Sequence, residues 1–105
     1  MQIVETSVFT RLINDLMDDD SYRMLQLELI RDPEKGAIIP GSGGLRKVRW
    51  KLKGHGKRGG IRVIYYWAVS RGKILMLYVF PKNVRADISK GQLEALRQIV
   101  EKEFR

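Results

Sequence analysis

The chain has 105 residues, 44% of them hydrophobic, and a formal net charge of +8. This length and composition favour one folded domain over residues 1–105, because each of two halves would be too small to bury an adequate core. The chain contains no cysteine, which excludes disulfides, thiolate metal sites and a small secreted scaffold held by cross-links.

The N-terminal residues predict a strand followed by a helix. Gln2–Glu5 is short and β-branched, and Thr6 or Ser7 can cap the helix that follows. The charged residues Glu5 and Arg11 fall within this stretch, which argues against a signal peptide or a membrane span. We therefore expect a cytoplasmic protein with no membrane partner. The apolar residues of the helix lie at helical spacing: Val8, Phe9, Leu12, Ile13 and Leu16.

A second helix is expected after the acidic cluster Asp18–Asp20, which closes the first one. Asp20 or Ser21 can cap it. It must stop near Asp32, because Pro33 follows. The segment Pro40–Gly44 then predicts a flexible connector with too little bulk to pack.

The middle of the chain predicts three antiparallel strands. The first, residues 45–53, alternates strictly, so that Val48 and Trp50 face one way and the cations face the other. Residues 61–69 are rich in β-branched and aromatic residues, and a tight turn at Arg71-Gly72 leads into residues 73–80. This last strand is apolar on both faces, so it should lie centrally in the sheet.

A terminal helix follows a capping box, in which Ser89 precedes Gln92 by three residues. The expected order is β-α-α-β-β-β-α. The predicted fold is therefore α+β, with a small antiparallel or mixed sheet packed on an N-terminal helical hairpin.

Positive charge is concentrated in the predicted sheet. Residues 1–34 hold three basic and eight acidic groups, residues 35–86 hold thirteen basic and no acidic groups, and residues 87–105 hold four of each. A solvated surface ordinarily mixes both signs, because like charges repel. Phosphate is the usual partner of such a surface, with an anionic membrane or an acidic protein as alternatives.

The strand at 45–53 offers a row of cations to a nucleic-acid backbone. Side chains two apart on one strand face lie about 6.6 to 6.8 Å from each other, which is close to the phosphate spacing of an extended single strand. The alternative is an edge strand that lysines protect from aggregation. The candidate RNA-binding residues of this segment are Arg46, Lys47, Arg49, Lys51 and Lys53.

Arg62 is the strongest candidate for a catalytic residue, because it interrupts an apolar strand directly after a glycine-rich basic loop. Its guanidinium could hold a scissile phosphate whose oxygens gain charge in the transition state. The alternative is an arginine that lies along aromatic rings for packing. Aromatic residues of the predicted sheet could stack on bases, although strands favour them in any case.

Acid-base groups are scarce in the basic segment. His55 is the only histidine, and residues 35–86 contain no Asp or Glu, so neither a histidine cluster nor paired carboxylates could hold a metal there. We expect no metal and no cofactor. RNA cleavage would then proceed by attack of the ribose 2′-hydroxyl on the adjacent phosphate. A lysine base needs a lowered pKa, which neighbouring cations favour, and Lys57 and Lys82 have such surroundings.

Three motifs resemble the RelE/HigB superfamily, and most closely its HigB2-like branch. They are Gly44–Trp50, Gly59–Tyr66 and Leu77–Asn83, and the resemblance covers nearly the whole chain. It implies a RelE-like microbial ribonuclease fold. It also implies a toxin of a type II toxin-antitoxin system that acts as a ribosome-dependent mRNA endoribonuclease (mRNA interferase).

The same resemblance implies site residues and partners. Arg62 matches the arginine that contacts the scissile phosphate, and Lys82-Asn83 lies where other members carry a basic segment. Asn83 stands where an arginine is expected, which leaves Arg85, Lys57 and Arg58 as substitutes. The implied partners are the ribosome, mRNA and a cognate antitoxin with a helix-turn-helix DNA-binding domain, through which alone operator DNA would be contacted. The alternative function is a non-catalytic RNA- or partner-binding module of the same fold.

Overall fold

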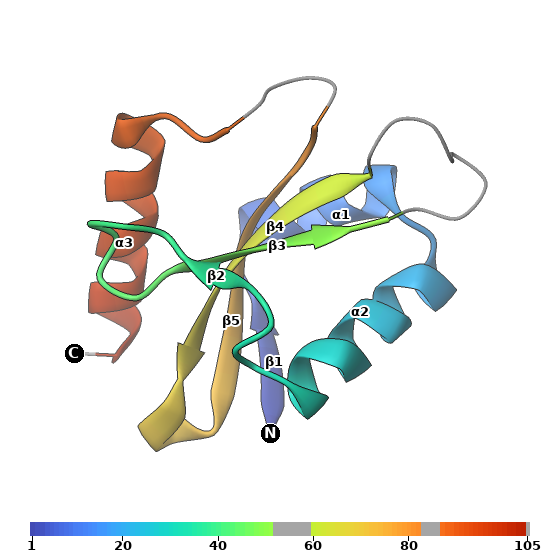
Figure 1. The fold of residues 1–105 in the computed structure, drawn as a ribbon, viewed down its shortest axis with the longest axis horizontal. Helices are drawn as coiled ribbons and strands as arrows, with labels where there is room; N and C mark the ends of the chain where they lie inside the picture. The colour runs from blue at the N-terminus through green and yellow to red at the C-terminus, as the bar shows by residue number, and fades with distance from the viewer. Residues whose placement is uncertain (52–59, 83–86, 105) are drawn as a thin grey trace.

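A computed structural model describes residues 1–51, 60–82 and 87–104 (Figure 1). Its strands form one sheet in the order β1-β5-β4-β3-β2. The expected α+β fold and the order of its main elements are confirmed, and the short strand β2 was not predicted. The elements are β1 (Gln2–Glu5), α1 (Ser7–Leu16), α2 (Asp19–Arg31), β2 (Ala37–Ile38), β3 (Arg46–Trp50), β4 (Ile61–Ala68), the 3₁₀ turn η1 (Val69–Arg71), β5 (Lys73–Pro81) and α3 (Lys90–Phe104).

The sheet is mixed, because β1 runs parallel to β5 while the other pairs are antiparallel. β5 lies between β1 and β4, as its apolar character on both faces predicts. The turn between β4 and β5 closes at Gly72, which has a φ of 60° and therefore adopts the left-handed conformation that glycine tolerates.

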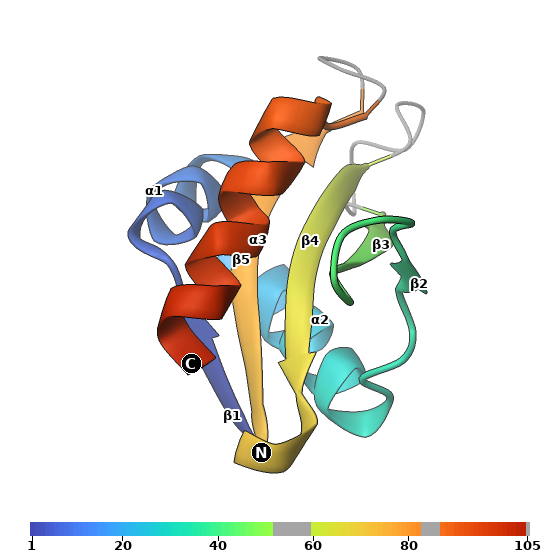
Figure 2. The same cartoon turned by 90° about the vertical axis from the view of Figure 1, so that its left-hand side faces the viewer.

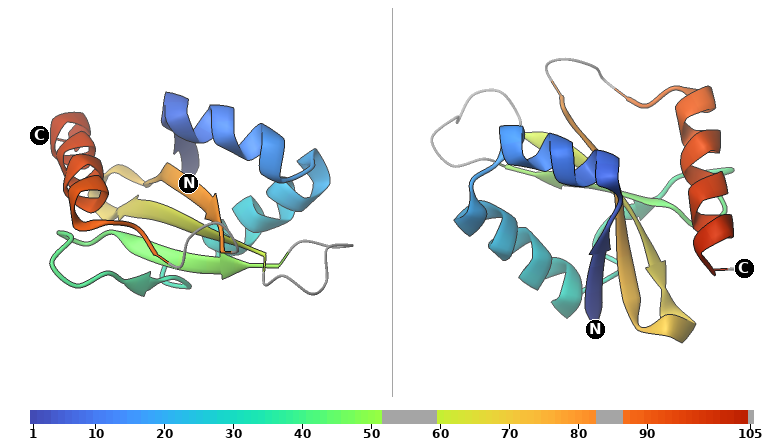
Figure 3. Two further views of the ribbon diagram at one scale, coloured as in Figure 1. Left: turned by 90° about the horizontal axis from the view of Figure 1, so that it is seen from above. Right: turned by 180° about the vertical axis from the view of Figure 1, so that it is seen from behind.

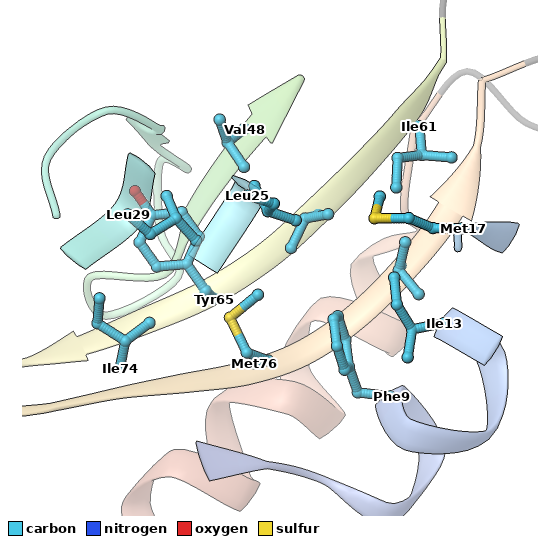
Figure 4. Packing of buried hydrophobic residues seen from close by; sticks show 12 residues of the cluster. Phe9, Ile13, Met17, Leu25, Leu29, Val48, Ile61, Tyr65, Ile74 and Met76 are labelled. Atoms are coloured by element: carbon cyan, nitrogen blue, oxygen red, sulfur yellow. The ribbon is translucent and has the colours of Figure 1, made fainter. Parts of the chain in front are cut away.

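Helices cover both faces of the sheet. Figure 2 shows α3 in front of it and α2 behind it, and the rear view of Figure 3 shows α1 lying over the sheet on the same side as α2. The core is accordingly split in two. The cluster under α1 and α2, part of which appears in Figure 4, is Phe9, Ile13, Met17, Leu25, Leu29, Val48, Ile61, Val63, Tyr65, Ile74, Met76 and Val79. The cluster under α3 is Leu45, Ile64, Leu75, Leu77, Phe80, Leu96 and Val100.

The helix starts follow capping chemistry, with one correction. Thr6, one of the two predicted caps, is the cap of α1 and accepts a hydrogen bond from the amide of Phe9. The cap of α2 is Asp18, whose carboxylate accepts from the amide of Ser21 at 2.7 Å, so the expectation of Asp20 or Ser21 was wrong. The reason is physical: starting earlier places two further carboxylates in the first turn, where the helix dipole favours negative charge.

The capping box before α3 is confirmed. The amide of Gln92 donates to Ser89 Oγ, and the amide of Ser89 donates to Gln92 Oε1, both at 3.1 Å. No helix among the residues described here has the length and apolar content needed to cross a membrane.

The segment 40–44 was wrongly predicted to be a connector that does not pack. Ser42 is only 1% exposed. Its hydroxyl donates to the carbonyl of Ile39 at 2.6 Å and accepts from the amide of Leu45 at 3.0 Å. One buried hydroxyl thus joins the two ends of the loop. The prediction failed because it considered only the small size of the residues around Ser42.

Candidate nucleic-acid interface

Strand register places three predicted site residues on one face of the sheet. Arg49 on β3 pairs with Arg62 on β4, and Lys47 pairs with Ile64 two residues along. Arg62 in turn pairs with Phe80 on β5, which belongs to the core under α3. Because paired residues share a face, Lys47, Arg49 and Arg62 lie on the α3 side, and we call these three the cationic face.

The cationic face lies beside α3 rather than beneath it. Figure 2 shows α3 running along β5, while no helix of the described chain crosses β3 on that side. Arg49 is exposed and Lys47 is half-buried. Arg49 and Lys47 are therefore not covered by a described helix, as a surface that receives a large ligand requires.

Arg62 is buried, with 6% of its surface exposed. Burial lowers the pKa of its guanidinium below the usual value, the positive charge of Arg49 lowers it further, and Asp87 opposes this. An arginine nevertheless stays protonated in proteins. The result is a permanent charge in a poorly hydrated position, where it interacts more strongly with an anion than it would in water.

Arg49 and Arg62 form a like-charged pair directly opposite each other on adjacent strands. Such pairs destabilise a sheet. A phosphate placed against both guanidinium groups would relieve the repulsion and would match their planar donor geometry.

Asp87 is the acidic residue that sequence reasoning missed. Its Oδ1 atom lies 3.0 Å from Lys47 Nζ and also accepts from the amide of Ile88 at 2.8 Å. The amide of Ile88, Lys47 and then the charge of Arg62 hold the pKa of the Asp87 carboxyl below its usual range. One sequence signal could have found it, since Asp87 is the acid that ends the acid-free segment 35–86.

Lys82 lies at the same end of the sheet as Arg62. Its amide donates to the carbonyl of Gly60 at 3.3 Å, immediately before β4 begins. Gly60 has a φ of 68°, and a Cβ atom there would come within 2.9 Å of the backbone of Lys51. Glycine is therefore required where β3 and β4 approach each other just before Arg62.

Two predicted RNA-binding residues are placed elsewhere. Arg46 donates to the carbonyls of Glu34 and Gly36, at 3.3 and 2.8 Å, and its ion pair with the Glu34 carboxylate spans 3.7 Å. These contacts tie the start of β3 to the segment after α2. Lys51 is exposed beyond the end of β3, at the edge of a hollow that Met24 and Trp50 also line. The predicted residues Lys53, Lys57, Arg58, Asn83 and Arg85 lie outside the described residues.

The sheet aromatics divide between the two faces. Trp50, Tyr65 and Trp67 belong to the core under α1 and α2, and Tyr65 is completely buried there. Tyr66 and Tyr78 are half-buried on the α3 side. Of these five aromatics, only Tyr66 and Tyr78 share a face with the cations.

Metal-ligating side chains do not gather in the described part of the chain. Residues 1–51, 60–82 and 87–104 contain no group of three or more His, Asp or Glu side chains placed to hold an ion. The chemistry that these residues offer is the binding of anions by fixed positive groups.

The fold and this face define a small α+β protein with a cationic sheet surface. A family model described as the RelE toxin of the RelE/RelB toxin-antitoxin system matches residues 1–105, and the chain belongs to this family of toxins. Membership implies a cognate antitoxin as partner. Among solved structures, the fold is similar to that of a double-arginine mutant of E. coli toxin RelE in the free state, with a TM-score of 0.62. The two sequences are 15% identical, and the match covers 92% of this chain and 95% of that one.

Proposed function

We propose that this toxin is a ribosome-dependent mRNA endoribonuclease, an mRNA interferase that arrests translation. The observation that carries the proposal is the buried Arg62 on β4, which pairs directly with the exposed Arg49 on β3. The two guanidinium groups together would bind an RNA phosphate through charge-assisted hydrogen bonds. Membership of the RelE toxin family supports the same function.

The proposed reaction is attack of a ribose 2′-hydroxyl on the adjacent phosphorus. The O2′–P bond forms and the P–O5′ bond breaks, which leaves a 2′,3′-cyclic phosphate and a 5′-hydroxyl. Arg62 would stabilise the charge that develops on the phosphoryl oxygens, while Lys47 and Arg49 hold the backbone. This route needs no metal or cofactor.

The proton transfers need a base for the 2′-hydroxyl and an acid for the leaving oxygen. Lys82 is a candidate because it directly follows β5 and its amide bonds to Gly60, which precedes Arg62 by two residues. The other candidates are Lys57, Arg58, Asn83 and Arg85, which lie outside the described residues. We propose Lys51 and Lys53 as further RNA-binding residues.

Ribosomes programmed with a defined mRNA in a purified translation system test the proposal. Wild-type protein should cut the mRNA, and the downstream fragment should carry a 5′-hydroxyl. Arg62→Ala should reduce the rate at least about a hundredfold, as removal of an oxyanion-stabilising donor does. Arg62→Lys should recover only part of it, since lysine lacks the bidentate fork.

The thermal unfolding of both variants should be measured in parallel, because Arg62 is buried. Cleavage that survives in folded Arg62→Ala would contradict the assignment of Arg62, and a 5′-phosphate on the fragment would contradict the 2′-hydroxyl route. The second candidate function, a non-catalytic RNA-binding module, is favoured if wild-type protein binds RNA in a salt-dependent way and leaves it intact.

The partners follow from this role. We propose that the toxin acts at the ribosome on mRNA, in the cytoplasm, as one domain. We also propose that its antitoxin carries a helix-turn-helix domain and is the only link to operator DNA.

A further inference from the structure

The outer side of α2 carries three exposed apolar residues where a surface helix is ordinarily polar. Leu25 and Leu29 are fully buried against the sheet. Leu27 lies two residues from each, which on a helix is a rotation of about 200°, and it is 55% exposed. Met24 and Ile30 continue the same outward stripe and are 56% and 37% exposed. Arg23 and Arg31, four residues before and after Leu27, are also exposed on this side, so the stripe is an apolar surface with charged neighbours that a partner can bury.

A hollow of about 700 Å³ adjoins the start of this stripe. Met24 and Trp50 contribute apolar walls, and Asp15, Asp18 and Asp20 contribute carboxylates. None of these three aspartates forms an ion pair with another described residue. Lys51 also lines the hollow, so its rim carries three carboxylates against one described cation and is negative on balance.

The charge of this region is opposite to that of the sheet. Residues 1–34 carry eight acidic and three basic groups, whereas residues 35–86 carry no acidic group. Phosphate-rich ribosomal RNA would be repelled by the aspartates. A protein segment with apolar anchors and flanking lysine or arginine would match both the stripe and its rim.

We infer that Met24, Leu27 and Ile30, together with the hollow beside them, form a docking surface for a basic amphipathic segment of the antitoxin. This inference rests on the proposed role of the chain as a toxin with an antitoxin, but it does not depend on the proposed RNA cleavage. Apolar side chains of the antitoxin cover the stripe, one of them enters the hollow beside Met24, and its cations face Asp15 and Asp20. Docking on α2 leaves the cationic face on the opposite side of the sheet.

Binding of the purified cognate antitoxin to the full chain tests the inference. Leu27→Lys removes an apolar contact and adds a positive charge that repels a basic segment, and it should raise the dissociation constant at least about tenfold. Val69→Lys is the matched control, because Val69 is 65% exposed but lies on the turn η1 after β4. It should bind as wild type does. Both variants should melt near the wild-type temperature, since both positions are exposed.

A second pair of variants tests the charge. Asp15→Asn with Asp20→Asn should weaken antitoxin binding at low salt, and the difference should shrink as salt screens it. Glu103→Gln on the exposed side of α3 should have no such effect. Unchanged affinity of Leu27→Lys, or no binding of the antitoxin by wild-type protein, would overturn the inference.

Analytical ultracentrifugation of the toxin alone tests whether a second copy of the chain, rather than the antitoxin, occupies the stripe. A self-association that Leu27→Lys abolishes, with antitoxin binding intact, would assign the stripe to a second copy of the chain and overturn the inference. Absence of mRNA cleavage with normal antitoxin binding would contradict the proposed nuclease function and leave the docking surface standing.

Discussion

Lys47 Nζ lies 3.0 Å from Asp87 Oδ1, so the cationic face already contains one carboxylate of the chain itself. The contact joins β3 to the residues that lead into α3, 40 positions apart in sequence. The Asp87 side chain is 59% exposed, so the ion pair adds little to stability. Its position on the proposed RNA surface gives it a larger effect on binding, because Asp87 competes with phosphate for Lys47.

Asp87→Asn should therefore strengthen RNA binding. The freed Lys47 can neutralise one more phosphate, which should steepen the slope of log affinity against log salt by about 0.7 for a single strand. Fluorescence anisotropy with a 2′-O-methylated oligonucleotide measures this without cleavage. Glu103→Gln changes the net charge equally at a site away from the face and serves as the control. Equal slopes for Asp87→Asn and wild type would show that Asp87 does not compete for the ligand.

Arg49→Gln should stabilise the free protein and weaken RNA binding. It removes the repulsion across β3 and β4, which is about 0.2 to 1 kcal/mol for like charges directly opposite and lies near the lower end for an exposed side chain. Urea unfolding measures the first effect and oligonucleotide binding the second. A variant that loses both stability and affinity would contradict the like-charge interpretation of the Arg49–Arg62 pair.

Tyr65→Phe should destabilise the fold although it removes a single oxygen atom. The buried hydroxyl donates to the carbonyl of Pro33 at 2.8 Å and accepts from the amide of Gly36 at 2.9 Å. Loss of that oxygen leaves a buried amide without its partner, at a cost of about 1 to 3 kcal/mol. Tyr78→Phe, at a half-buried position on the opposite face, is the control for urea unfolding. Equal unfolding midpoints for the two variants would refute this role.

Stability should fall at alkaline pH, partly through Tyr22. Burial raises the pKa of its phenol well above the ordinary value of 10.0, and the hydrogen bond to the Glu5 carboxylate at 2.5 Å adds to this. Because the folded pKa exceeds the unfolded one, the contribution is complete below about pH 10 and is lost as pH rises further. Urea unfolding between pH 8 and about 11.5 should show a smaller alkaline loss for Tyr22→Phe. If the unfolding stability of Tyr22→Phe changed with pH as that of wild type does, the contribution of Tyr22 would be contradicted.

Much of the fold was determined by local sequence signals. The alternation of Val48 and Trp50 with Lys47 and Arg49 fixes which face of β3 is polar, because side chains alternate along any strand. Capping chemistry fixes the start of α1 and of α3. These signals act over a few residues, so they can be read without the tertiary structure.

The site depended on contacts that sequence reasoning could not place. Arg46 lies on the face of β3 opposite to Lys47, and its hydrogen bonds to carbonyls of the segment after α2 are visible only in the tertiary structure. Asp87 and Lys47 meet only because the chain returns beside β3 on its way to α3. The sequence by itself determined the alternation, the charge separation and the family. The pairing of Arg49 with Arg62 and the outward stripe of α2 were decided by tertiary structure, since register and packing depend on residues distant along the chain.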